Sequence, residues 1–523
     1  MLQIQHLTLT HRQDGRTLLR DFNFVLRPGD RAVLIGEEGD GKSTLLRTIY
    51  DPALTADYME CTGAVVRGGL RLGYLPQELP ESAKAQTVAA FCASDPDFYG
   101  YAPSEVREWA ARVDLAPELM FADRPVGSLS GGEKVKLQIV CLLLRRPDVL
   151  LLDEPSGDLD LETLGWLERF LLECSRPVLY VSHDETLIER TANVVIHLEQ
   201  LRRKTEPKAT VARMPYREYA ARRLAGMERR EQLFRRERRE SARQQEKYRQ
   251  IRDRVEHQQA TVSRADPHGG QLLKKKMKAV KSMGRRFERE QENRTPEPES
   301  EDAILFRFPE DVSIPNGKTV LDFQLDALCA GGRTLARNIH LHVEGPEKLA
   351  IIGANGAGKT TLLRQIAAEL ATRNDIRCAY MPQDYDEGLN AGMTPVEYLA
   401  PTGDRAQITR VRTLLGSMRY TADEMEHPAS ELSGGQRAKL FFLKMMLDRC
   451  NVLVLDEPTR NFSPLSGPVI RAVLRDFGGT ILSVSHDRRY IAEVCDRVCL
   501  LTGEGLTPVQ NRDAGRLSEV APK

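Results

Sequence analysis

The chain has 523 residues, 75 acidic and 75 basic side chains, and nine cysteines. This length suits two or three domains with cores of their own. The cysteines are scattered, odd in number and without a C-x-x-C motif, so they suggest neither a disulfide framework nor a zinc site. Apolar stretches fall far short of the roughly 20 residues that span a bilayer, and the amino terminus lacks a secretory pattern. We therefore expect a cytoplasmic protein without a membrane domain.

A phosphate-binding loop comes first along the chain. The apolar run at 32–35 predicts a buried strand, and Gly36-Glu-Glu-Gly-Asp-Gly41-Lys42-Ser43 after it fits a P-loop. Glycines let backbone N–H groups face phosphate, the lysine reaches the β and γ oxygens, and the hydroxyl ligates Mg²⁺. A glycine-rich turn is more often only a loop, but that alternative explains neither the lysine nor the hydroxyl. The predicted nucleotide contacts here are Gly36, Gly39, Gly41, Lys42, Ser43 and Thr44.

An apolar strand with two terminal carboxylates follows, Val149-Leu-Leu-Leu-Asp153-Glu154-Pro. Neighbouring side chains on a strand point in opposite directions, so the two can have separate roles. A carboxylate at a strand end beside a P-loop can hold the Mg²⁺ shell, and its neighbour can orient or activate the attacking water. We assign Asp153 to the metal and Glu154 to catalysis. Alone, Asp-Glu-Pro could merely close a strand.

The middle of the chain is strongly basic. Residues 201–294 contain 29 Lys and Arg against 13 Asp and Glu, so the flanking regions carry the compensating negative charge. Pro215 suits a helix start, and the stretch to about Gln259 has no further proline and one glycine. Asp266-Pro-His-Gly-Gly270 predicts a break before a second helix from about Gln271 to Glu292. We expect an antiparallel hairpin with its tip at about 261–271.

The charge of this hairpin favours contact with a phosphate backbone, because its excess has one sign. The alternative is a solvated face that keeps a long helix in solution, but such a face more often mixes signs evenly. The tip has no aromatic residues, which favours backbone and shape contacts over base reading. The predicted nucleic-acid contacts are Arg264, His268, Lys274, Lys275, Lys276 and Lys278. A sparse apolar seam is more typical of packing between the helices: Leu224, Met227, Leu233, Tyr248, Ile251, Val255, Leu272, Met277, Val280, Met283 and Phe287.

The same phosphate-binding motifs recur after the hairpin. Gly353-Ala-Asn-Gly-Ala-Gly358-Lys359-Thr360 follows the apolar run 349–352, and Val452-Leu-Val-Leu-Asp456-Glu457-Pro provides the second pair of carboxylates. By the same argument, Asp456 is assigned to the metal and Glu457 to the water. The predicted nucleotide contacts are Gly353, Gly356, Gly358, Lys359, Thr360 and Thr361.

Two further motifs resemble the signature of ATP-binding-cassette (ABC) ATPases: Leu129-Ser130-Gly131-Gly132-Glu133 and Leu432-Ser433-Gly434-Gly435-Gln436. The signature serine precedes the metal-binding aspartate by 23 residues in both copies, and that aspartate precedes His183 or His486 by 30 residues. Equal spacing indicates duplication of a whole domain. We predict an α/β fold with two tandem P-loop ABC ATPase domains, 1–200 and 303–523, joined by a long basic α-helical hairpin at 201–302.

The resemblance implies composite ATP sites. Gln77 and Gln383 match the Q-loop of the family, and His183 and His486 match its switch histidine. Family geometry places each signature against the P-loop of the other domain, so that ATP closes the two domains and hydrolysis releases them. On this basis Ser43, Thr360, Gln77 and Gln383 join Asp153 and Asp456 around Mg²⁺. The signature residues Ser130, Gly131, Gly132, Ser433, Gly434 and Gly435 contact the nucleotide, and Glu154, Glu457, His183 and His486 are catalytic.

Two such domains around a charged helical linker resemble the ABC-F family over essentially the whole chain. The resemblance implies a monomer with intramolecular pairing of its ATPase domains, which binds the 50S part of the ribosome and its rRNA near the tRNA exit site. Its linker would reach toward the P-site tRNA and the peptidyl-transferase centre. Family members relieve stalling in translation or protect ribosomes against antibiotics, and both roles stay open, with a modest preference for protection. The rival functions are the ATPase subunit of a membrane transporter and a DNA-maintenance ATPase.

The sequence departs from the family pattern after the paired carboxylates. Where the family has Pro-Thr-Asn-His-Leu-Asp, this chain has Pro155-Ser-Gly-Asp-Leu-Asp160 and then Pro458-Thr-Arg-Asn-Phe-Ser463. Because Ser463 replaces the second aspartate, we expect unequal ATP sites. Family members often stack adenine on an aromatic residue before the P-loop; His11 and Cys329 are the candidates here, with His11 equally an ordinary turn residue. GTP stays an alternative to ATP.

Overall fold

The computed structural model describes residues 1–157, 159–201, 205–261, 267–292, 307–389, 392–418 and 420–509, without the side chains of 259–261, 267–273 and 287–292. The chain divides into two compact units. The first unit, Met1–Arg217 with Glu301–Lys523, contains both predicted ATPase domains. We call residues 1–217 the first cassette and residues 307–509 the second cassette. The second unit, Glu218–Ser300, contains most of the predicted linker.

The first cassette is built on a six-stranded sheet with the order β5-β6-β7-β3-β8-β9. Its strands are β3 (Arg31–Ile35), β5 (Leu72–Leu75), β6 (Val149–Asp153), β7 (Val178–Val181), β8 (Val194–Gln200) and β9 (Glu206–Ala212). All neighbours run parallel except β9, which is antiparallel to β8. Strands β6, β7 and β8 are buried along their whole length, as expected for a parallel sheet covered on both faces.

Helices and a small antiparallel sheet cover this core. The second sheet has the order β2-β1-β4, with β1 (Leu2–His11), β2 (Thr17–Leu26) and β4 (Met59–Val66). The helices are α1 (Lys42–Tyr50), α2 (Glu81–Lys84), α3 (Val88–Ala93), α4 (Pro103–Arg112), α5 (Gly131–Leu144), α6 (Leu161–Glu173) and α7 (Glu185–Thr191). The apolar faces of β1, β2 and β4 join α1 and the central sheet in one core, which fixes the P-loop between strand β3 and helix α1.

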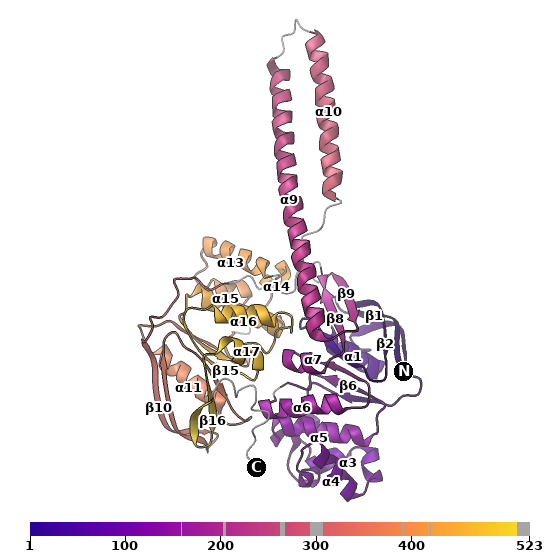
Figure 1. The fold of residues 1–523 in the computed structure, drawn as a ribbon, viewed down its shortest axis with the longest axis vertical. Helices are drawn as coiled ribbons and strands as arrows, with labels where there is room; N and C mark the ends of the chain where they lie inside the picture. The colour runs from indigo at the N-terminus through magenta and orange to yellow at the C-terminus, as the bar shows by residue number, and fades with distance from the viewer. Residues whose placement is uncertain are drawn as a thin grey trace. The chain divides into compact units, whose positions relative to one another are not determined.

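The second cassette repeats this plan, with the sheet order β13-β14-β15-β12-β16-β17. Its strands are β10 (Thr319–Ala330), β11 (Arg333–Glu344), β12 (Lys348–Ile352), β13 (Cys378–Met381), β14 (Val452–Asp456), β15 (Thr480–Val484), β16 (Arg497–Thr502) and β17 (Gly505–Val509). Its helices are α11 (Lys359–Ala371), α12 (Pro395–Leu399), α13 (Arg405–Ser417), α14 (Ala422–Glu426), α15 (Gly434–Leu447), α16 (Gly467–Arg475) and α17 (Arg488–Val494). The predicted fold of two tandem P-loop ATPase domains joined by a helical segment is confirmed (Figure 1).

The sheet of the first cassette extends beyond the predicted boundary at residue 200. Strand β9 pairs with β8 through partners that include Ala212 and Val195. An edge strand of polar and apolar residues inside a basic segment gives little strand signal, so the sequence placed these residues in the linker. The described end of the first sheet is therefore Ala212.

The linker forms a pair of helices, α9 (Tyr216–Thr261) and α10 (Pro267–Glu292), which run side by side (Figure 1). The predicted break at 266–270 is wrong for its last four residues, because α10 begins at Pro267. Proline fits the first helical position, where its missing N–H leaves no hydrogen bond unmade, and the first turn tolerates glycine. Only part of the predicted tip at 261–271 thus lies between the helices, and residues 262–266 lie outside the described residues.

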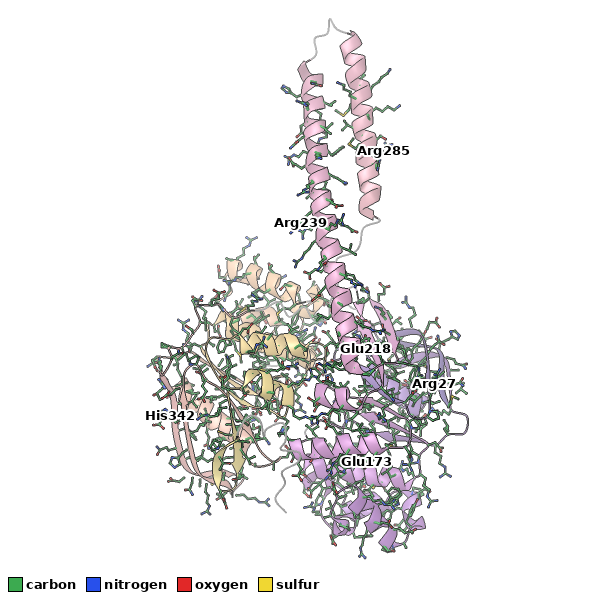
Figure 2. The ribbon with its side chains drawn as sticks, viewed as in Figure 1. Arg27, Glu173, Glu218, Arg239, Arg285 and His342 are labelled. Carbon is green, nitrogen blue, oxygen red and sulfur yellow. The ribbon has the colours of Figure 1, made fainter. Side chains whose placement is uncertain are left out.

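Packing between α9 and α10 involves part of the predicted apolar seam, of which the side chains of Leu272 and Phe287 lie outside the described residues. Val255 and Val280 are buried, and a Cβ at Gly284 would lie 2.7 Å from the Tyr248 hydroxyl, so the helices approach closely there. In contrast, four other seam residues are exposed: Leu224, Leu233, Ile251 and Met283. Figure 2 shows side chains, among them Arg239 and Arg285, along both helices. Among the described residues, no helix is long and apolar enough to cross a membrane.

Candidate nucleotide sites

Both P-loops adopt a backbone that only glycine accommodates at key positions. Gly41 and Gly358 have φ of 87° and 95° and lead directly into α1 and α11. A Cβ at Gly36 would lie 2.5 Å from the Leu198 carbonyl oxygen, and one at Gly353 would lie 2.6 Å from that of Leu501. These contacts hold each loop against the neighbouring strand of the sheet.

The P-loop lysines are buried and bent back over their own loops. Lys42 Nζ donates to the carbonyl oxygens of Gly36 at 3.0 Å and Glu37 at 2.8 Å. Lys359 Nζ makes the same contacts with Gly353 and Ala354, at 2.8 and 2.9 Å. Each ammonium group is therefore held by two carbonyl groups of its own P-loop, as expected for a cation that contacts a phosphate there.

The carboxylates assigned to the metal differ in their hydrogen bonds. Asp153 accepts from the Ser43 hydroxyl at 2.9 Å and from the Tyr74 hydroxyl at 3.2 Å. Burial raises the pKa of Asp456; Thr360 lowers it, but neither oxygen of this buried carboxylate makes a hydrogen bond of normal geometry to the described residues. Buried carboxylate oxygens without a partner, beside a hydroxyl, are a donor set suited to Mg²⁺.

The catalytic candidates Glu154 and Glu457 both adopt left-handed backbone, with φ of 50° and 51°. A non-glycine residue rarely holds this conformation, and such strain is common where a side chain must be aimed at a reaction. His183 Nε2 lies 2.9 Å from Glu154 Oε1, whereas His486 Nε2 lies 3.8 Å from Glu457 Oε1. The first glutamate–histidine pair is thus closed and the second is open.

The pKa values of the two glutamates are shifted in opposite directions. Burial acts to raise the pKa of Glu154, but attraction and hydrogen bonding to His183 outweigh it and lower the pKa overall. Burial and the neighbouring Asp456 raise the pKa of Glu457 to about 8. Burial, helped by the Lys359 charge, lowers the pKa of His486 to about 4. In the structure described, the neutral forms of Glu457 and His486 are favoured at the second pair and the charged form of Glu154 at the first.

Contacts between the cassettes bring each signature toward the other cassette. The Gly435 N–H donates to Glu38 Oε2 in the first P-loop at 3.1 Å, and Lys439 lies 3.7 Å from Glu37. Ser433 caps α15, as Ser130 caps α5, by accepting from the backbone three residues on. We call the P-loop at 36–43 with the signature at 433–436 the first site.

The second site combines the P-loop at 353–360 with the signature at 130–133. One cavity of about 1250 Å³ is lined by Ser130 and Gly131 together with Lys359 and Thr360. Burial raises the pKa of Asp160, but hydrogen bonds from Thr163 and from the Asn355 backbone lower it overall, so Asp160 reaches the second P-loop. Its counterpart Ser463 instead bonds within its own turn, to the Ser466 amide at 3.3 Å.

The cavity collects most of the predicted site residues. From the first cassette it is lined by Gly39, Gly41, Lys42, Ser43, Thr44, Gln77, Ser130, Gly131, Glu154 and His183, and from the second by Gly356, Gly358, Lys359, Thr360, Thr361, Gln383, Asp456, Glu457 and His486. Gly36, Gly132, Asp153, Gly353, Ser433, Gly434 and Gly435 are not in its lining. Glu38 lies against the second signature, since a Cβ at Gly434 would lie 2.7 Å from its carboxylate. Gly132 of the first signature instead packs against Thr163, whose hydroxyl would lie 2.6 Å from a Cβ at this position. The roles of all these residues stay predictions.

Several contacts could not be found from the motifs. His183 Nδ1 lies 2.9 Å from the Phe462 carbonyl oxygen of the other cassette, and Tyr74 contacts Asp153. The adenine candidate His11 instead pairs with Asp14 at 3.0 Å, whereas Leu18 and Leu335 line the cavity. Among these contacts only that of Tyr74 has a signal in the sequence, because Tyr74 lies two residues before the Q-loop proline. The contact to the Phe462 carbonyl oxygen has none, because every residue carries a backbone oxygen.

The predicted nucleic-acid contacts lie on or beside α10. Lys274, Lys275, Lys276 and Lys278 are exposed on this helix. The helix also contains His268, whose side chain lies outside the described residues, as does the whole of Arg264. The described part of this candidate surface is thus a run of four exposed lysines.

Known proteins resemble this chain along most of its length. The family model described as ABC transporter matches residues 19–157 and 336–460, just over half of the chain. "ABC transporter F family member 5" of Arabidopsis thaliana is 26% identical over 92% of this chain and 72% of its own length. "Ribosome protection protein VmlR" of Bacillus subtilis is 27% identical over 97% of this chain and 88% of its own.

A solved structure supports the fold independently. The archaeal ribosome recycling factor aABCE1, in complex with the ribosomal stalk protein aP1, matches with a TM-score of 0.58. The match covers 97% of this chain and 90% of that one at 17% identity. With its duplicated cassettes, paired signatures and helical linker, the chain belongs to the ABC-F family of ATP-binding-cassette ATPases.

Proposed function

We propose that this protein hydrolyses ATP to ADP and phosphate at the two composite sites and uses the resulting closure and opening on the ribosome. In this proposal, the α9–α10 hairpin acts on the P-site tRNA or the peptidyl-transferase centre of the 50S subunit. The observation that carries it is the Gly435 N–H at the first P-loop, with Ser130 and Lys359 lining one cavity. Such an arrangement lets a bound nucleotide contact both cassettes at once.

Each site has the groups that phosphoryl transfer needs. Ser43, Gln77 and Asp153 would hold Mg²⁺ in the first site, and Thr360, Gln383 and Asp456 in the second. When bound, Mg²⁺ offsets the charge that develops on the β and γ phosphates. The buried oxygens of Asp456, which make no hydrogen bond of normal geometry to the described residues, favour such a cation.

The residues of the chain would then bind the phosphates and orient the attacking water. Lys42 and Lys359, already surrounded by loop carbonyl groups, exchange these partners for phosphate oxygens. Glu154 and Glu457 orient the attacking water and accept its proton, and His183 and His486 hold the glutamates and the γ phosphate. ATP is the expected substrate.

A ribosomal role is supported by the relatives and by charge. VmlR, which matches this chain over nearly its full length, is named a ribosome protection protein. The exposed lysines at 274–276 and 278 suit the phosphate backbone of rRNA or tRNA. We favour protection of the ribosome against antibiotics, with relief of stalling as the alternative, and we place the protein in the cytoplasm as a monomer.

Co-sedimentation tests the proposal. The Glu154→Gln, Glu457→Gln double variant should remain closed around ATP and pellet with ribosomes rather than with duplex DNA or lipid vesicles. Enrichment on DNA would favour the DNA-maintenance alternative, and enrichment on vesicles the transporter alternative. Measuring drug tolerance of cells with and without the protein then separates protection from stalling relief, since unchanged inhibition by peptidyl-transferase drugs contradicts protection.

The hairpin has a matched control. Replacing Lys274, Lys275, Lys276 and Lys278 by Gln should weaken ribosome binding most at low salt and make binding less dependent on salt, because fewer counterions are released. A control chain loses four exposed arginines of the second cassette instead: Arg333, Arg337, Arg405 and Arg410. Equal weakening by both sets would contradict a role for the lysines.

A further inference from the structure

Two buried ion pairs join the cassettes beside the switch histidines. Arg488 donates to Glu168 at 2.6 Å, and Arg471 lies 2.9 Å from Glu185. These side chains are shielded from water: Arg471 is 2% exposed, Glu168 8%, and Glu185 and Arg488 9% each. Buried charges interact more strongly than surface charges, and leaving one without its partner is strongly unfavourable.

The two pairs are pseudo-symmetric copies of one contact. Glu168 and Arg471 occupy equivalent positions, each 15 residues after the metal-binding aspartate of its cassette. Glu185 and Arg488 are also equivalent, each two residues after its switch histidine. The same two positions therefore meet twice across the interface, but the first cassette provides both acids and the second provides both arginines.

The inversion extends to a third position in each cassette. Within the first cassette, Arg190 donates to Glu168 at 2.9 Å. Within the second, Arg471 donates to Glu493 at 2.8 Å. Arg190 and Glu493 each lie seven residues after the switch histidine, so they are equivalent positions with opposite charges. We call these six residues the charge-inverted network: Glu168, Glu185, Arg190, Arg471, Arg488 and Glu493.

The signs of these charges determine which two cassettes can pair. If two copies of the first cassette met in this geometry, Glu168 would face Glu185 of the other copy. Two copies of the second cassette would bring Arg471 and Arg488 together. In either arrangement like charges face each other in a desolvated interface, which is strongly unfavourable. Glu168 keeps Arg190 and Arg471 keeps Glu493 within its own cassette, but Glu185 and Arg488 lose their partners across the interface. Only a first cassette with a second cassette satisfies every charge.

We propose that the charge-inverted network selects the partner of each cassette, so that the first closes on the second and not on another copy of itself. The inference rests on the closing motion of the proposed function. Pairing within one chain and exchange between two chains satisfy the network equally, but the linker gives the partner in the same chain a high effective concentration. A monomer is thus the expected product.

Three variants test the network in the full chain. The basic variant carries Glu168→Arg, Glu185→Arg and Arg190→Glu, so that both cassettes are basic. The acidic variant carries Arg471→Glu, Arg488→Glu and Glu493→Arg. The inverted variant carries all six substitutions together with Asp184→Asn and Arg489→Gln, because Arg488 also lies 3.5 Å from Asp184 and Arg489 lies 2.8 Å from Glu185. It restores complementarity with the signs exchanged. A matched control makes the same kinds of substitution at exposed positions of the first cassette: Glu162→Arg, Glu173→Arg and Arg169→Glu.

Closure is read by energy transfer between fluorophores placed through non-natural amino acids at Arg27 and His342, one exposed site on each cassette (Figure 2). We expect the basic and acidic variants to need at least about tenfold more ATP for half-closure, which corresponds to the loss of one or more buried pairs. The inverted variant and the control should close as the unsubstituted chain does.

Mixing provides a second measurement. The basic and acidic variants complement each other, so native mass spectrometry of the mixture should show a one-to-one complex that neither variant forms alone. Normal closure of the basic and acidic variants would overturn the inference. So would an inverted variant that melts like the unsubstituted chain but does not close.

Failure of the proposed function can be distinguished from failure of the charge-inverted network. If the unsubstituted chain does not respond to ATP, the closing motion is contradicted. The mixed complex still decides the network, because complementary pairing of the two variants requires no turnover.

Discussion

In the first site the switch histidine is held on both ring nitrogens, by Glu154 and by the Phe462 carbonyl oxygen, whereas the second site leaves His486 3.8 Å from Glu457 and its Nδ1 buried without a hydrogen bond to the described residues. The loops after the paired carboxylates also differ. Asp160 reaches the second P-loop, and Ser463 bonds within its own turn. A substitution in one cassette is therefore felt in the site completed by the other.

The P-loops differ as well. The first has Glu37 and Glu38 where the second has Ala354 and Asn355. Glu38 accepts from the signature amide that a phosphate would be expected to contact. The same motif spacing thus allows two sites with different electrostatics, and four experiments test this difference.

The largest expected effect is loss of turnover on Glu154→Gln with Glu457→Gln, by at least about 100-fold, because removal of a general base commonly has this size. Of the two single variants, Glu154→Gln should lose more turnover at neutral pH than Glu457→Gln. Glu154 is held charged beside His183, while burial favours the neutral form of Glu457. Phosphate release by the purified chain measures both, with exposed Glu162→Gln as the control. Equal losses would remove the contrast.

A smaller effect is expected at the histidines. His183→Ala, measured with Glu457→Gln so that only the first site turns over, should slow phosphate release about tenfold, the scale of one charge-assisted hydrogen bond. His486→Ala, measured with Glu154→Gln, should slow it less than about threefold, because its contact is already open. If the second loss matches the first, the open pair closes during turnover and the sites work alike.

A change of several-fold in affinity is expected from Glu38→Asn. Removing a carboxylate from the first P-loop should tighten ATP binding there by roughly fivefold, since like charges about 4 Å apart near water repel by about 1 kcal/mol. The reciprocal Asn355→Glu should weaken binding at the second site. Calorimetric titration of both into the Glu154→Gln, Glu457→Gln background measures this. Unchanged affinity on Glu38→Asn would show that its carboxylate moves aside freely.

The smallest effects concern stability and pH, measured by thermal unfolding without nucleotide and with a chelator. The fold raises the pKa of Glu457 from 4.5 to about 8, so it favours the protonated form and loses stability as pH rises through this window. Glu457→Gln, which cannot ionise, should therefore melt higher than the unsubstituted chain above pH 8 and not below pH 4.5.

Glu154→Gln should act in the opposite direction. The pKa of Glu154 is lowered, so its contribution to stability is present above 4.5 and is lost as pH falls. This variant should melt lower near neutral pH, with the difference shrinking in acid. Shifts of roughly 2–4 °C for each kcal/mol are expected for domains of this size. Melting shifts of the same sign would contradict the electrostatic contrast.

Local motifs made much of the fold predictable. The strand before the first P-loop ends with its apolar run at Ile35, and the strand before the first carboxylate pair ends at Asp153, one residue after its apolar run. The long helix α9 begins one residue after Pro215, as proline at a helix start predicts. These features depend on neighbours in sequence, and the duplication repeats the same signal.

Features that depend on distant residues were not predictable. The contact of Glu38 with Gly435 and the burial of Glu168 against Arg488 join residues more than 300 positions apart. Pro267 was interpreted as part of a break, although proline both ends one helix and begins another. His11 is a candidate for stacking on adenine because it carries a ring, yet the register of β1 and β4 turns it toward Tyr58. Leu18 lines the nucleotide cavity instead.

The partner of His183 on the second cassette is a peptide oxygen, that of Phe462. Residue 462 can change its side chain without removing this oxygen, since every amino acid carries it. The link between the cassettes is thus protected from most point substitutions and is exposed mainly to insertions, deletions or a rerouted main chain. Relatives can therefore share this contact between the cassettes even where their side chains at this position differ.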